Sequence, residues 1–156
     1  MYVIVILVTL TSVASAAPPE PGAPVAKSDC PAAAAAAISA ANSEWLPAMK
    51  RGDVSAIVAP YADDAVFVTH AGEAIQGRSA IADLYRQRLA SFTVVGGEIA
   101  NGGCLTAALG LVYEWGDASL VMAQKNGSQS TSHGPYLTVW RIDAKGIWHI
   151  ARNLVL

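Results

Sequence analysis

Residues 135–155, with the sequence PYLTVWRIDAKGIWHIARNLV, indicate most directly which fold this chain adopts. Two runs rich in β-branched and aromatic residues, 135–142 and 147–155, flank a short segment that contains Gly146. This pattern is typical of two antiparallel strands joined by a turn. Similar runs, divided by segments that contain glycine or asparagine, precede it at 92–100, 104–115 and 119–125. The second half of the chain therefore predicts an antiparallel sheet.

The residues before this sheet show helical spacing of their apolar side chains. Pro31 suits the first position of a helix that extends to residue 50, and Ile38, Trp45 and Met49 recur in it at helical intervals. Pro47 removes one hydrogen bond inside this helix and is expected to bend it near its end. The other expected elements are a helix over 54–59, strands over 65–70 and 74–76, and a helix from residue 79.

Helices followed by a run of antiparallel strands predict an α+β fold. The sheet must cover one face with the helices, so a strongly curved sheet is expected to wrap around the N-terminal helices as a cone. Such a cone has a hollow interior, and a hollow interior predicts a binding pocket. The length of 156 residues fits one domain, which we place at 30–156.

The N-terminal segment has the features of an export signal. Residues 1–16 carry no charge, contain an apolar run over 3–10 and end in Ala14-Ser15-Ala16, small residues suited to signal cleavage. A short membrane anchor is the alternative. Residues 17–29 are rich in proline and alanine and predict a flexible linker. The protein is therefore expected to be secreted or periplasmic, without stable membrane insertion after cleavage.

Charge and cysteine content narrow the classes of partner. Ten Lys and Arg against twelve Asp and Glu give a net charge of −2, with no basic run, which disfavours nucleic acid as a partner. Cys30 and Cys104 form a disulfide or remain two separate buried thiols, and the sequence leaves both options open. Two cysteines are too few for a zinc site by themselves. The sequence contains no glycine-rich phosphate loop and no paired metal-binding cysteines, so neither a metal nor a cofactor is expected.

Four segments carry a resemblance to a known family. They are 45–53, 61–67, 75–81, and 136–141 followed by 146–152. In this order the chain resembles the nuclear transport factor 2-like superfamily, especially its SnoaL-like and ketosteroid-isomerase-like bacterial members. The resemblance covers residue 33 to the C-terminus and implies the conical α+β fold. A shared fold does not by itself imply a shared reaction.

The resemblance also shows which catalytic groups are missing. Ketosteroid isomerases use a tyrosine as oxyanion donor, an aspartate as base and a protonated aspartic acid as second donor. The corresponding positions in this chain are Trp45, Thr69 and Thr138. Many SnoaL-like members carry an aspartate where this chain has Asn153. Because threonine and asparagine cannot serve as bases at neutral pH, steroid-isomerase chemistry is disfavoured.

Other side chains remain candidates for a pocket or for chemistry. Glu114 and His149 are weak catalytic candidates. Glu114 is a candidate if it points inward; the alternative is an ion pair with Arg141 or Arg152. His149 is a candidate because it shares strand parity with Asn153 and is therefore expected to point inward. His70 is expected to face away from the pocket, and His133 is expected in a solvated loop. The predicted pocket residues are Trp45, Tyr61, Phe67, Thr69, Tyr85, Tyr136, Thr138, Trp140 and Asn153, for which ordinary core packing is the alternative.

Two functional hypotheses follow. The first is an exported protein that binds a small hydrophobic or aromatic ligand, with cofactor-independent isomerase, cyclase or hydrolase activity as an extension. The second is a noncatalytic interaction or scaffold module. Either is expected to be a homodimer, because the outer face of the sheet is too large to remain apolar and exposed in a soluble chain.

Overall fold

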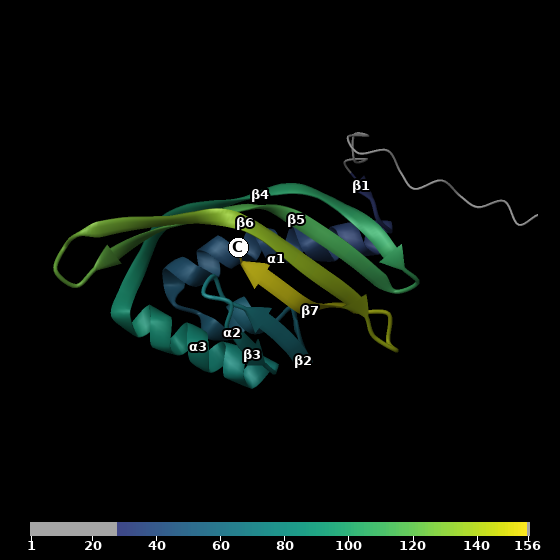
Figure 1. Cartoon of the computed structure of the whole chain (residues 1–156), viewed down its shortest axis with the longest axis horizontal. Coiled ribbons are helices and arrows are strands. Elements are labelled where there is room, and N and C mark those ends of the chain that lie inside the picture. Colours follow the sequence, from purple (N-terminus) through teal and green to yellow (C-terminus); the bar gives the residue numbers. More distant parts are fainter. Residues whose placement is uncertain (1–27, 156) are drawn as a thin grey trace, which may run out of the picture.

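The computed structural model describes residues 28–155, so the predicted signal peptide and nearly all of the predicted linker lie outside the described residues. Figure 1 shows helices packed beneath one arched sheet. The helices are α1 (Ala32–Arg51), α2 (Val54–Val58) and α3 (Arg78–Ser91). The strands are β1 (Ser28–Asp29), β2 (Tyr61–Val68), β3 (Ala74–Gln76), β4 (Phe92–Ala108), β5 (Leu111–Gln124), β6 (Gln129–Ile142) and β7 (Trp148–Val155). The predicted α+β class is confirmed.

The strands form one sheet in the order β1-β4-β5-β6-β7-β2-β3. The long strands β4 to β7 pair antiparallel, as predicted. Two pairs at the sides of this antiparallel region are parallel, β1 with β4 and β2 with β7. β2 follows the helical N-terminal region and enters the sheet beside the last strand. Its position could not be predicted by pairing strands that are neighbours in sequence as hairpins.

Irregularities in β4 accompany the curvature of the sheet. Its pairing with β5 shifts between Val94 and Gly96, between Asn101 and Gly103, and between Thr106 and Ala108. Bulges of this kind bend a strand and increase its twist. Figure 1 shows β4, β5 and β6 arching over α1, with α2 and α3 below. The predicted wrapping of a curved sheet around the helices is confirmed.

One glycine-containing segment was predicted as a turn but lies in a strand, and another was predicted within a strand but forms a turn. A turn was predicted between strands 92–100 and 104–115, but Gly102 and Gly103 lie inside β4. The turn lies at Leu109 and Gly110, inside the second predicted strand, where Gly110 adopts a φ of 76°. The segment 128–132, expected as a loop, belongs mostly to β6. The sequence alone does not distinguish a glycine in a bulge from a glycine in a turn, which explains why the turn was predicted in the wrong segment.

The helices bury apolar side chains against the concave face of the sheet. Ile38 and Met49 of α1, Ile57 of α2 and Ile81 of α3 are buried in one cluster with Trp140. Each such burial contributes roughly 2 kcal/mol relative to an exposed side chain. α1 continues through the predicted bend at Pro47 and ends at Gly52, which has a left-handed φ of 66°. No helix within residues 28–155 has the length and hydropathy needed to cross a membrane.

A disulfide joins the start of α1 to β4. The structure bonds Cys30 to Cys104, with a Cα–Cα distance of 5.8 Å and a sequence separation of 74. β1 pairs beside this bond, with Ser28 opposite Cys104, so residues 28 and 29 belong to the sheet rather than to the linker. Of the two options that the sequence left open, the structure therefore adopts the bonded one.

Candidate functional site

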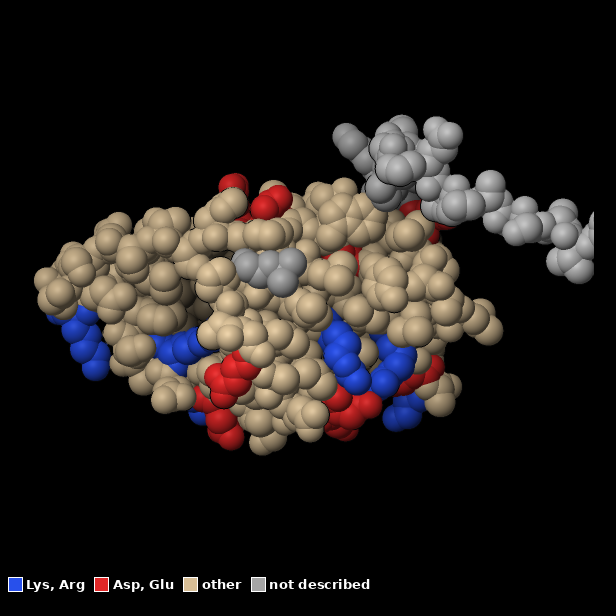
Figure 2. All heavy atoms as spheres, in the orientation of Figure 1, with Lys and Arg blue, Asp and Glu red and all other residues tan. Residues whose placement is uncertain are grey.

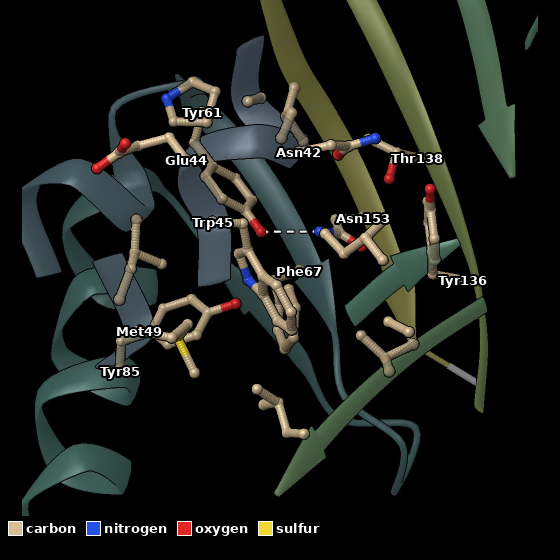
Figure 3. Close-up of a pocket in the computed structure, with 18 of the residues that line it drawn as sticks. Asn42, Glu44, Trp45, Met49, Tyr61, Phe67, Tyr85, Tyr136, Thr138 and Asn153 are labelled. Carbon is tan, nitrogen blue, oxygen red and sulfur yellow. Dashed lines mark hydrogen bonds between the residues drawn. The ribbon is translucent and has the colours of Figure 1, made fainter. Parts of the chain in front are cut away.

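A cavity of about 880 Å³ lies between the concave face of the sheet and the helices. Its wall is mainly aromatic and aliphatic, and Figure 3 shows part of it. Eight of the nine predicted pocket residues line it: Trp45, Tyr61, Phe67, Tyr85, Tyr136, Thr138, Trp140 and Asn153. Thr69 does not. Its side chain is buried in the turn after β2, where its hydroxyl accepts a hydrogen bond of 3.2 Å from the backbone N–H of Glu73.

Three polar side chains form a row along the sheet wall of the cavity. Glu114 of β5 pairs directly with Thr138 of β6, and Thr138 pairs with Asn153 of β7. Directly paired residues point to the same face of a sheet with their Cβ atoms about 5 Å apart. All three line the cavity. The concave wall therefore carries a polar stripe within an otherwise mainly apolar surface.

Glu114 is the buried centre of a hydrogen-bond cluster. Only 1% of its surface is exposed. Its Oε1 accepts hydrogen bonds from Asn42 Nδ2 at 2.6 Å, Asn101 Nδ2 at 2.9 Å and the Tyr136 hydroxyl at 2.9 Å. Its Oε2 accepts one from Trp140 Nε1 at 2.7 Å. Burial and the neighbouring Glu114 carboxylate raise the pKa of Tyr136. Tyr136 therefore stays a protonated donor.

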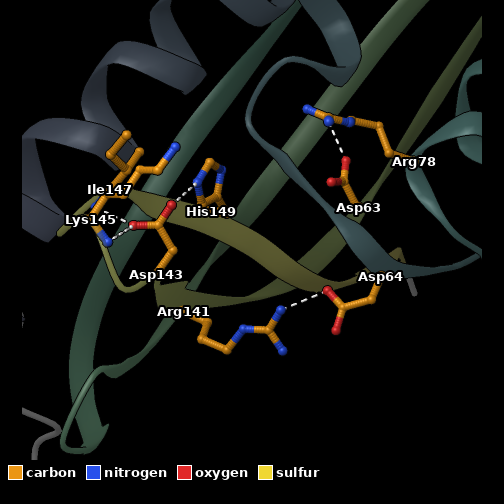
Figure 4. Close-up of polar contacts among 8 residues, drawn as sticks. All are labelled: Asp63, Asp64, Arg78, Arg141, Asp143, Lys145, Ile147 and His149. Carbon is orange, nitrogen blue, oxygen red and sulfur yellow. Dashed lines mark hydrogen bonds and ion pairs between the residues drawn. The ribbon is translucent and has the colours of Figure 1, made fainter.

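The surface ion pair that was the alternative for Glu114 does not form. Arg141 instead donates to Asp64 Oδ1 at 2.6 Å, as Figure 4 shows, and this bond lowers the pKa of Asp64. Arg152 donates to the carbonyl oxygen of Ala151. Strand parity explains the difference, because Arg141 and Arg152 occupy the outer face while Glu114 lies on the inner one.

Three residues of this cluster were missed by the sequence analysis. Asn42 and Asn101 supply two of the four donors, and Gly116 leaves space for Tyr136. A Cβ on Gly116 would lie 2.8 Å from the ring of Tyr136, the residue opposite it in β6. The one available signal was Asn42, a polar residue within an alanine-rich helical segment. Asn101, followed by two glycines, was interpreted as a turn.

A second hydrogen-bonded group lies at the Asn153 end of the polar stripe. Asn153 Nδ2 donates to the Tyr61 hydroxyl at 2.8 Å, as Figure 3 shows. Burial raises the pKa of Tyr61 well above its usual value. Burial also raises the pKa of Tyr85, while hydrogen bonds from Tyr61 and Trp45 act in the opposite direction. The Tyr61 hydroxyl thus accepts a hydrogen bond from Asn153. Asn153 Oδ1 is buried without a hydrogen-bond partner.

His149 lines the cavity, but its strand parity differs from the predicted one. The pairing of β6 with β7 shifts between Val139 and Trp140, so that His149 pairs with Arg141 and leaves the parity of Asn153. Its Nε2 lies 3.2 Å from Asp143 Oδ2 (Figure 4). The pKa of Asp143 is lowered first by the backbone N–H of Ile147, with smaller contributions that include His149. His149 is therefore a turn-stabilising residue.

The remaining histidines lie at the margin of the cavity. His70 is exposed just beyond the end of β2 and touches the cavity lining. His133 lies in β6, not in the expected loop, and is exposed as expected. Within residues 28–155 there is no cluster of three potential metal-ligating side chains. Neither histidine has a carboxylate partner among the described ion pairs.

Comparison with known proteins places this geometry in a family. A family model for the SnoaL-like domain matches residues 43–150. A ketosteroid isomerase-like protein from Erwinia carotovora atroseptica is 22% identical, with a TM-score of 0.67 over 77% of this chain and 92% of that one. A cystatin-like domain from Nostoc punctiforme is also 22% identical, with a TM-score of 0.64 over 81% and 78% of the two chains.

A third solved structure, ActVI-ORFA from Streptomyces coelicolor, is 11% identical, with a TM-score of 0.65 over 79% of this chain and 96% of that one. No curated protein sequence matches the chain. Identities of this size show the shared fold and leave the reaction open. The family model, in contrast, spans more than half of the chain. The chain belongs to the SnoaL-like domain family, with the nuclear transport factor 2-like fold.

Proposed function

We propose that the protein binds a small, mostly apolar, ring-containing molecule in its cavity. The observation that carries this proposal is the cavity itself, about 880 Å³ with aromatic walls and one polar stripe. Ligand sites of roughly 300–1,000 Å³ typically combine apolar walls with a few fixed polar groups. Trp45, Phe67 and Trp140 supply flat apolar contacts, while Thr138 and Asn153 supply polar ones.

Binding is better supported than proton-transfer catalysis. Trp45 and Thr138 line the cavity, but neither has the acid–base chemistry of the corresponding isomerase groups. Glu114 is the carboxylate of the polar stripe, and three hydrogen bonds already converge on its Oε1 and one on its Oε2. These donors occupy Oε1 fully and leave one acceptor position on Oε2, beside Trp140, so Glu114 has little capacity to serve as a general base.

Blocking the cavity is expected to abolish binding. Ala118 lines the cavity from β5, so Ala118→Phe places a ring in the space that the ligand needs. Binding of 1-naphthaleneethanol, measured by isothermal titration calorimetry, should weaken at least tenfold, about 1.4 kcal/mol. Ala90→Phe is the matched control, because Ala90 is exposed on α3 and does not line the cavity. Absence of binding to the unmodified protein, or equal binding by both variants, would contradict the proposal.

We also propose that the outer face of the sheet mediates homodimerisation. Leu105 and Tyr113 pair across β4 and β5 on this face and are 36% and 42% exposed. Tyr113 in turn pairs with Val139, and Trp115 pairs with Leu137 in the neighbouring row. Contiguous apolar side chains of this kind mark interaction surfaces. This surface also supports the alternative function of an interaction module.

Two lysines on this face are expected to produce monomers. The double variant Leu105→Lys and Tyr113→Lys places like charges at the centre of the proposed interface, where neither is compensated. Sedimentation velocity should show a dimer for the unmodified protein and a monomer for the variant. Asp83→Lys, on the exposed surface of α3, serves as the control and should remain dimeric. An unchanged sedimentation coefficient in the double variant would contradict the proposal.

Export is proposed as well, with secretion or periplasmic location as the result. The apolar segment over 3–10 and the small residues before Ala17 support it. The disulfide between Cys30 and Cys104 adds support, since such bonds persist in oxidising compartments. The intact mass of protein recovered outside the cytoplasm should correspond to a chain that begins at Ala17. A chain that retains Met1 would contradict signal cleavage.

A further inference from the structure

The charge of Glu114 has no positive partner among the described residues. None of the ion pairs within residues 28–155 includes it. Arg88 is the one Lys or Arg among the residues that line the cavity, and its guanidinium lies over the Phe67 ring, 5.9 Å from the ring centre. A carboxylate removed from water is costly unless hydrogen bonds or an opposite charge compensate it.

The surroundings of Glu114 fit the ionised carboxylate. All four of its hydrogen-bond partners act as donors: two amide groups, one phenol and one indole. A protonated carboxyl would need an acceptor among them. The hydrogen bonds converge unequally, three on Oε1 and one on Oε2, so that Oε2 keeps an acceptor position. These donors are neutral, so none of the hydrogen-bond partners of Glu114 carries a charge opposite to that of the carboxylate.

A second acceptor without a partner lies on the same wall. Asn153 Oδ1 is buried without a hydrogen-bond partner. Asn153 Nδ2 donates to the Tyr61 hydroxyl at 2.8 Å, so this amide group directs its nitrogen toward Tyr61 and its Oδ1 away from it. Thr138 lies between Asn153 and Glu114 in the cross-strand row. The wall thus offers acceptors, one of them charged, to whatever occupies the cavity.

We propose that the ligand carries a protonated amine, or a similar cationic nitrogen with N–H donors, which is held at the Glu114–Thr138–Asn153 stripe. This inference rests on the proposed binding function and names the chemical class of its ligand. Glu114 supplies the opposite charge, and Asn153 Oδ1 accepts a hydrogen bond. The rings of Trp140, Tyr136 and Trp45, which line the same cavity, favour a cation over their faces and an apolar ring beside them.

Three naphthalene probes of nearly equal size separate the charge from the apolar contacts. They are 2-(1-naphthyl)ethylamine, which is cationic at pH 7, neutral 1-naphthaleneethanol, and anionic 1-naphthaleneacetate. Isothermal titration calorimetry with the unmodified full chain should give an amine affinity at least tenfold higher than that of the alcohol, with the carboxylate weakest. Equal affinities for amine and alcohol, or tighter binding of the carboxylate, would overturn the inference and leave the binding proposal intact.

The Glu114→Gln variant tests which residue is responsible. It retains the size of the side chain and removes its charge, so the preference for amine over alcohol should fall to less than threefold. Glu98→Gln is the matched control, because Glu98 is an exposed carboxylate on the outer side of β4 and its loss should leave the preference unchanged. A full preference in folded Glu114→Gln protein would overturn the role of Glu114. Failure of all three probes to bind would instead count against the proposed binding function.

Discussion

Replacement of Glu114 by alanine is expected to lower the free energy of unfolding by about 3–5 kcal/mol. The reason is the number of donors that the carboxylate serves. Asn42, Asn101, Tyr136 and Trp140 would each lose their acceptor. Tyr136 and Trp140 are buried, whereas Asn101 is exposed and can turn to water. A buried donor left without a partner costs about 1–3 kcal/mol. Water that enters the enlarged cavity offers new hydrogen bonds and reduces the total cost for these donors.

Urea denaturation followed by circular dichroism measures this loss. Glu98→Ala is the control, since the Glu98 side chain is exposed on the same sheet and its removal should change stability by less than about 0.5 kcal/mol. Glu114→Gln should fall between the two, because its amide oxygen still serves the donors near Oε1 while its amide nitrogen faces the Trp140 N–H group. If Glu114→Ala were as stable as Glu98→Ala, the cluster would have no structural importance.

Strand alternation predicted much of the cavity wall. Tyr136, Thr138 and Trp140 were expected on one face because they alternate along one run, and all three line the cavity. The argument needed no knowledge of neighbouring strands. Apolar spacing in α1 likewise predicted the inward side of Trp45. Local periodicity is sufficient to predict which side chains face the cavity wherever a helix or strand remains regular.

Strand alternation was a poorer guide where a strand was irregular. His149 and Asn153 differ by four positions and should share a face, but the register shift opposite Val139 and Trp140 reverses the parity between them. A bulge of one residue depends on how two strands pair, and that pairing is not encoded by either strand alone. Thr69 failed for a related reason, since its hydroxyl is used by the turn that follows β2.

The donors around Glu114 could not be predicted because they come from distant parts of the chain. Asn42 lies 72 residues from Glu114 in sequence, and Asn101 lies 13 residues away. Each polar residue alone has an ordinary interpretation, as an exposed helical position or as part of a turn. Only the tertiary contact between α1, β4 and β5 shows that both serve one carboxylate. Burial of that carboxylate was one of the two alternatives that the sequence left open, and its partners were not predicted.

Removal of the disulfide is expected to cost about 4 kcal/mol of stability, as large an effect as the loss of Glu114. The bond closes a loop of 74 residues in sequence separation, from Cys30 before α1 to Cys104 in β4. Closing such a loop removes conformational freedom mainly from the unfolded chain. The double variant Cys30→Ala and Cys104→Ala should therefore unfold at a lower urea concentration. Addition of a reductant should destabilise the unmodified protein to the same extent and leave the double variant unchanged.

Removal of the disulfide should change ligand binding in the cavity much less than it changes the free energy of unfolding. Cys30 and Cys104 do not line it, and the walls are held by the sheet, by α1 to α3 and by the Glu114 cluster. Affinity for 1-naphthaleneethanol in the folded double variant should thus remain within about twofold of the unmodified protein, because an effect on the unfolded state does not change the binding site. A stability loss below about 1 kcal/mol would show that the unfolded chain is not constrained by this bond. A collapse of binding would show that the bond shapes the native cavity, since the anchoring of α1 against β4 would then position Asn42 and Trp45.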